Sequence, residues 1–146
     1  MGFPSFLHEE VVTLTVQEMY QKTKAWMFEK PSSTIYDNYI VQITNKILAE
    51  TYEENNMCRM FKGKLPFIDG IAAHQVSEMT DEIDYEEEYL LDVIPKGIDA
   101  NFLMDDDLSK MGILQTEYNN ARVMRQCLVP METVEKLTWE AEHGTD

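Results

Sequence analysis

The stretch that decides the fold runs from Glu78 to Asp107 and reads EMTDEIDYEEEYLLDVIPKGIDANFLMDDD. It holds twelve acidic residues and one lysine, so it carries −11 of the chain's net charge of −15. An apolar row runs through the acids at helical spacing, where side chains three and four residues apart share a face. The stretch therefore predicts a helix with its apolar face toward a core and its acids toward water. The row comprises Tyr89, Leu90, Val93, Ile94, Ile98, Phe102 and Leu103.

The size and composition of the chain favour one folded, acidic domain. With 146 residues and a hydrophobic share of 44%, the chain can build a core of its own. The net charge of −15 opposes binding to nucleic-acid phosphates and to anionic membranes. We expect no signal peptide and no membrane span, because neither pattern occurs in the sequence. Cys58 and Cys127 lack metal or redox spacing, which favours buried free thiols over a disulfide.

Capping residues and prolines divide the chain into expected helices. Thr15 and Glu18 fit a capping box, and Thr34, Asp84 and the Asp105–Asp107 triplet are further candidate N-caps. The expected helices are Val16 to about Phe28, Ile35 to about Met60, Tyr85 to about Met104, Leu108 to about Leu128, and a short Met131–Glu142. The apolar row of the first is Val16, Met19, Tyr20 and Met27, and that of the fourth is Leu108, Met111, Leu114, Tyr118, Ala121, Met124 and Leu128. Beside the apolar face of the second helix runs a polar stripe of Asn45, Tyr52, Asn55, Asn56 and Arg59.

Two interruptions mark the middle of the chain. Pro95 is expected to bend the third helix, and Gly97 would let another helix approach closely. The segment Phe61–Ser77 contains no helical period, yet it is too apolar for a tether, so it is expected to be a binding element.

The expected fold is therefore mainly α, a bundle of about four to five helices with a long irregular loop between the second and third. It forms a single domain over residues 1–146. Residues 1–12 are a possible N-terminal arm, residues 13–129 the helical core, and residues 130–146 a C-terminal docking segment.

No catalytic, cofactor or metal site is predicted. The Asp105–Asp107 triplet lacks the spacing of a calcium loop and is better explained as a helix cap. Glu86, Glu87 and Glu88 are adjacent glutamates at a helix start, without the contrasting environments that acid–base catalysis needs. The three histidines are scattered and pair with no second ligand type.

Several long side chains have two interpretations each. Arg59 or Arg122 is expected to pair with an acid of the third helix, with a subunit contact as the alternative, and Arg125 is grouped with them. Trp139, near Val134 and Leu137, either closes the core or docks on a partner.

A series of short motifs follows a fixed order within residues 36–128. They are Asn45-Lys46-Ile47-Leu48, Asn55-Asn56-Met57-Cys58-Arg59, Asp81-Glu82-Ile83-Asp84-Tyr85-Glu86-Glu87-Glu88-Tyr89, Ile94-Pro95-Lys96-Gly97, Ala100-Asn101-Phe102-Leu103, Asp105-Asp106-Asp107 and Tyr118-Asn119-Asn120-Ala121-Arg122. This order resembles the head–tail adaptor (connector) proteins of tailed bacteriophages. Those proteins often carry a "DEI-Y-EE" start, a "P-x-G-x-x-A" helix and a "DDD…Y…AR" helix.

The resemblance implies a structural subunit without catalytic residues that assembles with itself into a ring of about twelve copies. Such a ring lies beneath the portal protein in the neck of the virion, after assembly in the host cytoplasm. It extends a channel through which DNA passes without specific binding, and it docks a stopper or tail protein. The candidate channel-facing or inter-subunit acids are Glu86, Glu87, Glu88 and Asp92. The candidate portal-docking residues are Val134, Leu137 and Trp139, and the candidate tail-side loop residues are Leu65, Phe67 and Ile68.

Two other classes of function stay open from the sequence. The first is an acidic helical binding module, a DNA mimic or regulator, that occupies a basic partner surface. The second is a metal-dependent enzyme, which rests on the Asp105–Asp107 triplet alone.

Overall fold

The computed structural model describes residues 13–102, 108–125 and 141–142. It is mainly helical, as the sequence predicts, with one two-stranded antiparallel ladder in the described part of the chain. The elements are β1 Leu14–Thr15, α1 Val16–Trp26, α2 Ile40–Glu50, α3 Tyr52–Phe61, a 3₁₀ turn Ile71–His74, β2 Glu82–Ile83, a π-helical turn Tyr89–Val93, α4 Ile94–Phe102 and α5 Leu108–Met124.

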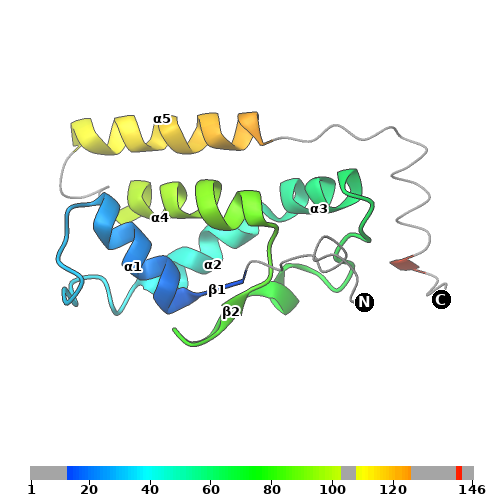
Figure 1. The fold of residues 1–146 in the computed structure, drawn as a ribbon, viewed down its shortest axis with the longest axis horizontal. Coiled ribbons are helices and arrows are strands. Elements are labelled where there is room, and N and C mark those ends of the chain that lie inside the picture. The colour runs from blue at the N-terminus through cyan, green and yellow to red at the C-terminus, as the bar shows by residue number, and fades with distance from the viewer. Residues whose placement is uncertain (1–12, 103–107, 126–140, 143–146) are drawn as a thin grey trace, which may run out of the picture.

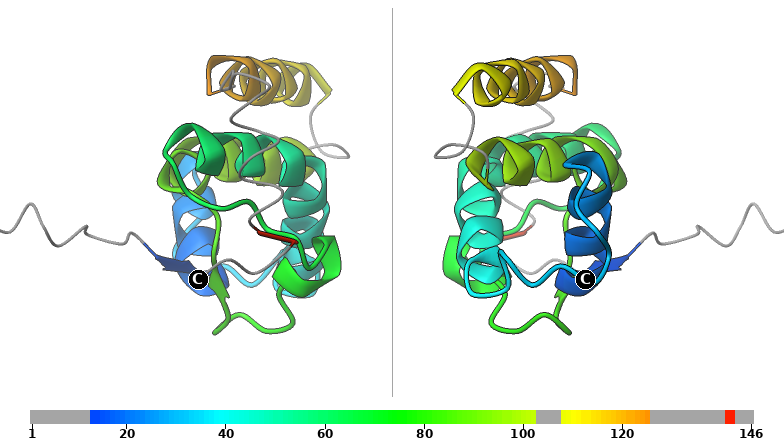
Figure 2. Two further views of the ribbon diagram at one scale, coloured as in Figure 1. Left: turned by 90° about the vertical axis from the view of Figure 1, so that its right-hand side faces the viewer. Right: turned by 90° about the vertical axis from the view of Figure 1, so that its left-hand side faces the viewer.

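The helices form layers around α4. α4 packs against α5 on one side and against α1 and α2 on the other (Figures 1 and 2). The β1–β2 ladder lies on the far side of the molecule from α5, where Leu14 pairs with Ile83. The core lies between α4 and the α1–α2 layer, where burial of large apolar side chains stabilises the fold. Its fully buried members include Tyr20, Ile40, Ile47, Leu48, Tyr89, Leu90, Ile94 and Ile98.

The first helix follows the sequence prediction closely. Glu18 donates its backbone N–H to the Thr15 hydroxyl, and the Glu18 carboxylate accepts from the Thr15 backbone, so the capping box is confirmed. The predicted apolar row of Val16, Met19, Tyr20 and Met27 is buried. The helix ends at Trp26, two residues before the expected end at Phe28.

The second helix was predicted as one piece from Ile35 to Met60, which is wrong. It begins at Ile40, so Thr34 is not its N-cap, and in the turns before it Asp37 accepts a 2.7 Å hydrogen bond from the Tyr20 hydroxyl. It is interrupted at Thr51, whose hydroxyl donates to the Ile47 carbonyl at 2.8 Å and whose backbone leaves helical geometry. α2 and α3 are therefore separate helices.

The third helix starts and continues differently from the prediction. Helical structure runs from residue 87 to Phe102, so the expected Asp84 cap is wrong, and the Asp84 carboxylate faces His74 instead. A π-helical turn over Tyr89–Val93 precedes Pro95, and the Ile94 N–H bonds to the Tyr89 carbonyl five residues back. The wider turn accommodates a proline that lacks an N–H.

The last described helix, α5, ends at Met124. Tyr118 and Ala121 are buried, as predicted, whereas Met124 is 82% exposed, so its place in the predicted core row is wrong. The predicted Asp105–Asp107 cap, the arm 1–12, Cys127 and most of the predicted helix Met131–Glu142 lie outside the described residues.

Candidate functional site

Two asparagines fasten the irregular segment that follows α3. The Asn56 side chain accepts from the Phe67 N–H at 2.8 Å and donates to the Phe67 carbonyl at 3.3 Å. The Asn45 side chain makes the same pair of bonds with Val76, at 2.8 Å and 2.9 Å. Each amide replaces the backbone of a neighbouring strand, because it offers one donor and one acceptor to an extended residue. The segment expected to be an irregular binding element is therefore held at two points.

Phe67 is also held from three further directions. The Tyr52 hydroxyl donates to its carbonyl at 3.1 Å, and the Arg59 guanidinium lies 4.4 Å from its ring centroid. Arg59 also donates to the Leu65 carbonyl at 2.8 Å. The His74 ring stacks on Phe67, with the two ring centroids 3.6 Å apart. Phe67, one of the predicted tail-side loop residues, is thus half-buried and packs against the core.

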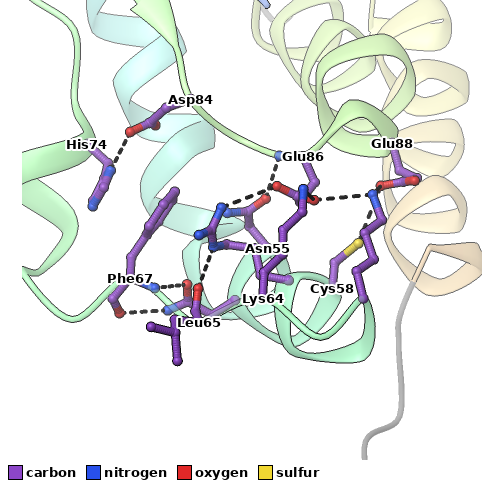
Figure 3. A network of polar contacts seen from close by, with 12 residues as sticks. Asn55, Cys58, Lys64, Leu65, Phe67, His74, Asp84, Glu86 and Glu88 are labelled. Atoms are coloured by element: carbon purple, nitrogen blue, oxygen red, sulfur yellow. Dashed lines mark hydrogen bonds and ion pairs between the residues drawn. The ribbon is translucent and has the colours of Figure 1, made fainter. Parts of the chain in front are cut away.

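Glu86 is the buried centre of an ionic cluster whose cations are partly exposed (Figure 3). Its side chain is 6% exposed and faces Lys64 at 2.8 Å, Lys62 at 3.2 Å and Arg59 at 3.4 Å. Its backbone N–H donates to the Asn55 side chain at 2.8 Å. Burial opposes the charge, but the two lysines outweigh burial and hold the pKa of Glu86 below its usual range. Glu86, one of the candidate channel-facing or inter-subunit acids, is therefore buried and paired with cations of its own chain.

The other three candidate acids, Glu87, Glu88 and Asp92, differ in exposure and in ion pairing. Glu88 accepts from Lys62 at 2.7 Å and from the buried free thiol of Cys58 at 3.4 Å, in line with the free thiol predicted there. Asp92 is paired with Lys96 at 2.6 Å on its own helical segment. Glu87 is exposed. Of the four acids, Glu87 alone is neither buried nor paired in an ion pair between described residues.

The His74 ring contacts two aspartates of the segment between α3 and the π-helical turn. Its Nδ1 lies 2.6 Å from Asp84 and its Nε2 lies 2.6 Å from Asp69. Two carboxylates facing both ring nitrogens require an imidazolium, which donates twice. Burial opposes that charge, but the hydrogen bonds to Asp84 and Asp69 raise the pKa of His74 above its usual value. Asp84, expected as a helix cap, serves in this contact instead.

Two arginines fasten α5 to the rest of the molecule. Arg122 pairs with Glu54 of α3 at 3.1 Å, whereas an acid of the third predicted helix was expected as its partner. Arg125 pairs with Asp92 at 3.2 Å, and Arg59 pairs with Glu86, so both of these reach the predicted third helix. Beside Arg122 lies an open hollow of about 250 Å³, lined by Glu54, Asn119, Arg122 and Val123.

One buried acid was missed by the sequence analysis. Asp99 of α4 was expected to face water, but it is 1% exposed, and its carboxylate has no hydrogen-bond partner among the described residues. Burial and the negative charge of Glu117 raise the pKa of Asp99 to about 8, against the opposing effect of Lys110. Asp99 therefore holds its proton at neutral pH.

Large apolar side chains are exposed in several places, among them Ile113, Val123 and Met124 of α5. Two further groups lie toward opposite ends of the long axis. One group lies in the segment that joins α1 to α2, and the other lies at the end of α3 and in the segment after it (Figure 1). We name them the α1–α2 patch and the α3 patch. The α1–α2 patch comprises Trp26, Phe28, Ile35 and Tyr39. The α3 patch comprises Phe61, Leu65, Ile68 and Ile71.

The two patches relate to the sequence predictions in different ways. Leu65 and Ile68, predicted for a tail-side loop, are 42% and 56% exposed, in contrast to Phe67. The α1–α2 patch was missed, because Phe28 and Ile35 were assigned to helix ends. The available signal was the run of Lys30, Pro31, Ser32 and Ser33, which is typical of a turn and leaves its apolar neighbours without a helix face.

The candidate docking residues near the C-terminus are not placed by the structure. Val134, Leu137 and Trp139 lie outside the described residues. Within the described ranges, no His, Cys, Asp and Glu side chains form a group of three placed to hold a metal ion. No helix in that part of the chain is both long and apolar enough to cross a membrane.

Comparison of the chain with protein-family models, curated proteins and solved structures found no match.

Proposed function

We propose that this chain is a head–tail adaptor subunit of a tailed bacteriophage, which works by assembly and carries out no chemical reaction. The motif order within residues 36–128 supports this class of protein by resemblance. The observation that carries the proposal is the pair of exposed apolar patches at opposite ends of one helical subunit. Exposed apolar clusters on a small protein mark surfaces that another macromolecule covers.

The internal charge pairing supports a scaffold that keeps its shape on assembly. Glu86, Glu88 and Asp92 are held by cations of the same chain, so they stiffen the subunit. Glu87 stays available for a channel wall along which DNA slides, because like charges repel. In this proposal the ring forms from copies of the chain, binds the portal protein on one side and accepts a stopper or tail protein on the other.

The rival function is an acidic module that occupies a basic partner surface. The exposed acids Glu78, Glu82 and Glu87 favour it, since no ion pair between described residues neutralises them. Burial and pairing of Glu86 weaken this alternative, because the acidic surface is smaller than the sequence suggests.

The test is to mix the purified chain with the portal protein of the same virus and with a nucleic-acid-binding protein. We expect co-elution with the portal and, in electron micrographs, an added ring below it. Removal of residues 131–146, which include the candidate docking residues Val134, Leu137 and Trp139, should weaken that attachment. Binding to the basic protein without binding to the portal would replace the adaptor by the rival function.

A further inference from the structure

The inference concerns α5, which forms an outer layer of the molecule. It lies along one side of α4, and it packs mainly on α4 and on the π-helical turn that precedes α4 (Figures 1 and 2). Among the α5 side chains that the structure describes, Tyr118 and Ala121 are buried, whereas Ile113, Val123 and Met124 are exposed. An element with few buried apolar side chains is held less strongly than the core, so it can open while the core stays folded.

Ion pairs hold the C-terminal end of α5. Arg122 donates to the Glu54 carboxylate at 3.1 Å and to the Glu50 carbonyl at 3.3 Å. Arg125, directly after α5, pairs with Asp92 at 3.2 Å. All four side chains of these two ion pairs are partly exposed, and such pairs contribute little because water competes for both partners. The docking of α5 therefore depends strongly on the buried surface that it shares with α4.

Asp99 is buried where α4 meets α5. It is 1% exposed, and neither of its carboxylate oxygens has a hydrogen-bond partner among the described residues. The charged groups that act on it are Glu117 and Lys110, which both belong to α5. A buried charge without a hydrogen-bond partner is costly, so the docked arrangement of the two helices favours the protonated carboxyl group.

The charged side chains of the other elements that pack against α4 have partners of their own. Each of them makes a hydrogen bond, an ion pair or a ring contact with a residue other than Asp99. They are Glu18, Lys22 and Lys24 of α1, Lys46 and Glu50 of α2, and Asp92 of the π-helical turn. The charge that faces Asp99 therefore comes from α5, where Glu117 opposes its ionisation and Lys110 favours it.

We propose that α5 is a latch that docks on α4 while Asp99 is protonated and undocks when Asp99 ionises. In the docked state the ionised carboxylate would lie in a buried site, without a described hydrogen-bond donor and facing Glu117. Undocking brings the carboxylate into water, where its charged form is stable. It also uncovers the face of α4 at Gly97, which Tyr118 covers in the docked state. The latch is a property of this chain and does not depend on the adaptor role.

The direction of the pH effect follows from the two states of Asp99. In the docked state, burial raises the pKa of Asp99 to about 8, whereas the ordinary pKa of an exposed aspartate is 3.8. Between these two values undocking releases a proton. The equilibrium constant for undocking should therefore rise by up to about tenfold per pH unit and level off above about pH 8.

Hydrogen exchange of the full-length chain, followed for each amide by nuclear magnetic resonance, measures the undocking. Exchange rates at about pH 6, 7 and 8, divided by the intrinsic rates at the same pH, give the equilibrium constant for opening at each amide. The α5 amides should open more often than the α2 amides, and from about pH 6 to about pH 8 their opening should increase by up to about 100-fold. Asp99→Asn is neutral at every pH, so its α5 amides should show one constant level of opening over this range.

Two further variants separate the attachment of α5 from its response to pH. Asp92→Asn is the matched control, because Asp92 pairs with Arg125 and its pKa is lowered, so it stays ionised over this range. This change should loosen α5 at every pH and leave the increase with pH intact. Glu117→Gln alters an exposed side chain and removes a charge that raises the pKa of Asp99, so the increase should level off at a lower pH.

Three results would overturn the latch. Equal opening of the α5 and α2 amides at each pH would show that α5 leaves α4 only when the whole protein unfolds. An opening of α5 that does not change with pH in the wild type would show that no proton is released on undocking. An increase with pH that persists in Asp99→Asn would assign the response to another group.

Discussion

Gly97 of α4 lies directly against the ring of Tyr118 of α5. A methyl group at Gly97 would come within 2.8 Å of Tyr118 Cε1 and within 2.9 Å of Ile47 Cδ1 in α2. Gly97 is therefore a point at which α4 approaches both neighbouring helices closely, as its place in the sequence predicts. The Tyr118 hydroxyl donates to Glu50 at 3.1 Å, which limits how far the ring can retreat.

Gly97→Ala should therefore destabilise the fold, although alanine is the better helix former. Overpacking costs about 1–3 kcal/mol, which exceeds the gain in helix propensity of up to about 1 kcal/mol. Chemical denaturation measures the change in the free energy of unfolding. Gly112→Ala in α5 is the control, because nothing lies within 4 Å of the added methyl group, and this variant should gain stability. A Gly97→Ala protein that is as stable as the Gly112→Ala protein would contradict the close approach.

The buried Asp99 should make the protein less stable as the pH rises. The pKa of Asp99 in the folded state is about 8, whereas its ordinary value is 3.8. Between these values the folded state holds a proton that the unfolded state has lost. Stability therefore falls with rising pH, by up to about 1.4 kcal/mol per pH unit, and levels off above pH 8.

Asp99→Asn tests this dependence, because the amide is neutral at every pH. The difference in unfolding free energy between the variant and the wild type should grow in favour of the variant from pH 5 to about pH 8. Glu117→Gln should reduce the effect, since it removes the negative charge that helps to raise the pKa of Asp99. A difference that stays constant over this range would show that Asp99 is ionised in the folded protein.

The features that sequence reasoning predicted are those set by neighbours along the chain. The Thr15 capping box, the buried row of α1 and the close approach at Gly97 each follow from residues within a few positions or from the absence of a side chain. At Pro95 the sequence predicts a bend, and the structure has a π-helical turn directly before the proline, which was not expected. Local rules were sufficient because the residue types that set these features lie within one helix or at its end.

The features that were missed depend on partners distant in sequence. Glu86, Glu87 and Glu88 look alike in the sequence, and Glu86 alone is buried because three cations from α3 and the segment after it converge on it. Asn45 and Asn56 stand out as a polar stripe beside an apolar face, but nothing in their spacing names Val76 and Phe67 as partners. Partners this far apart in the sequence can be identified only from the tertiary structure.

The hydrogen bonds of Asn45 to Val76 and of Asn56 to Phe67 should be separable by hydrogen exchange. Asn56→Ala leaves the Phe67 N–H without its 2.8 Å acceptor, so this amide should exchange faster while the Val76 amide stays protected. Asn45→Ala should give the reverse pattern, and each variant serves as the control for the other. We expect a loss of about 1–3 kcal/mol in the free energy of unfolding for either change, since the backbone N–H and carbonyl of one residue lose their hydrogen-bond partner. Equal protection of both amides in both variants would show that the segment is held by other contacts.

His74 should titrate above its ordinary pKa and stabilise the loop only while it is charged. Burial alone would lower the pKa, whereas the hydrogen bonds to Asp84 and Asp69 raise it, so the direction of the shift depends on the two carboxylates. The folded state therefore binds the proton more tightly than the unfolded state. The stability from this contact is fully present below the unfolded pKa of about 6.5 and is lost as the pH rises through the higher folded value.

A nuclear magnetic resonance titration of the His74 ring measures this pKa directly. Asp84→Asn and Asp69→Asn should each lower the pKa, because each removes one charged acceptor. The double variant leaves burial as the main influence and should place the pKa below its ordinary value. Asp81→Asn is the matched control, since its carboxylate accepts from the backbone of Ser77 and Glu78 and does not contact the ring. A pKa in the wild type at or below 6.5 would mean that the imidazole does not donate to both carboxylates at once.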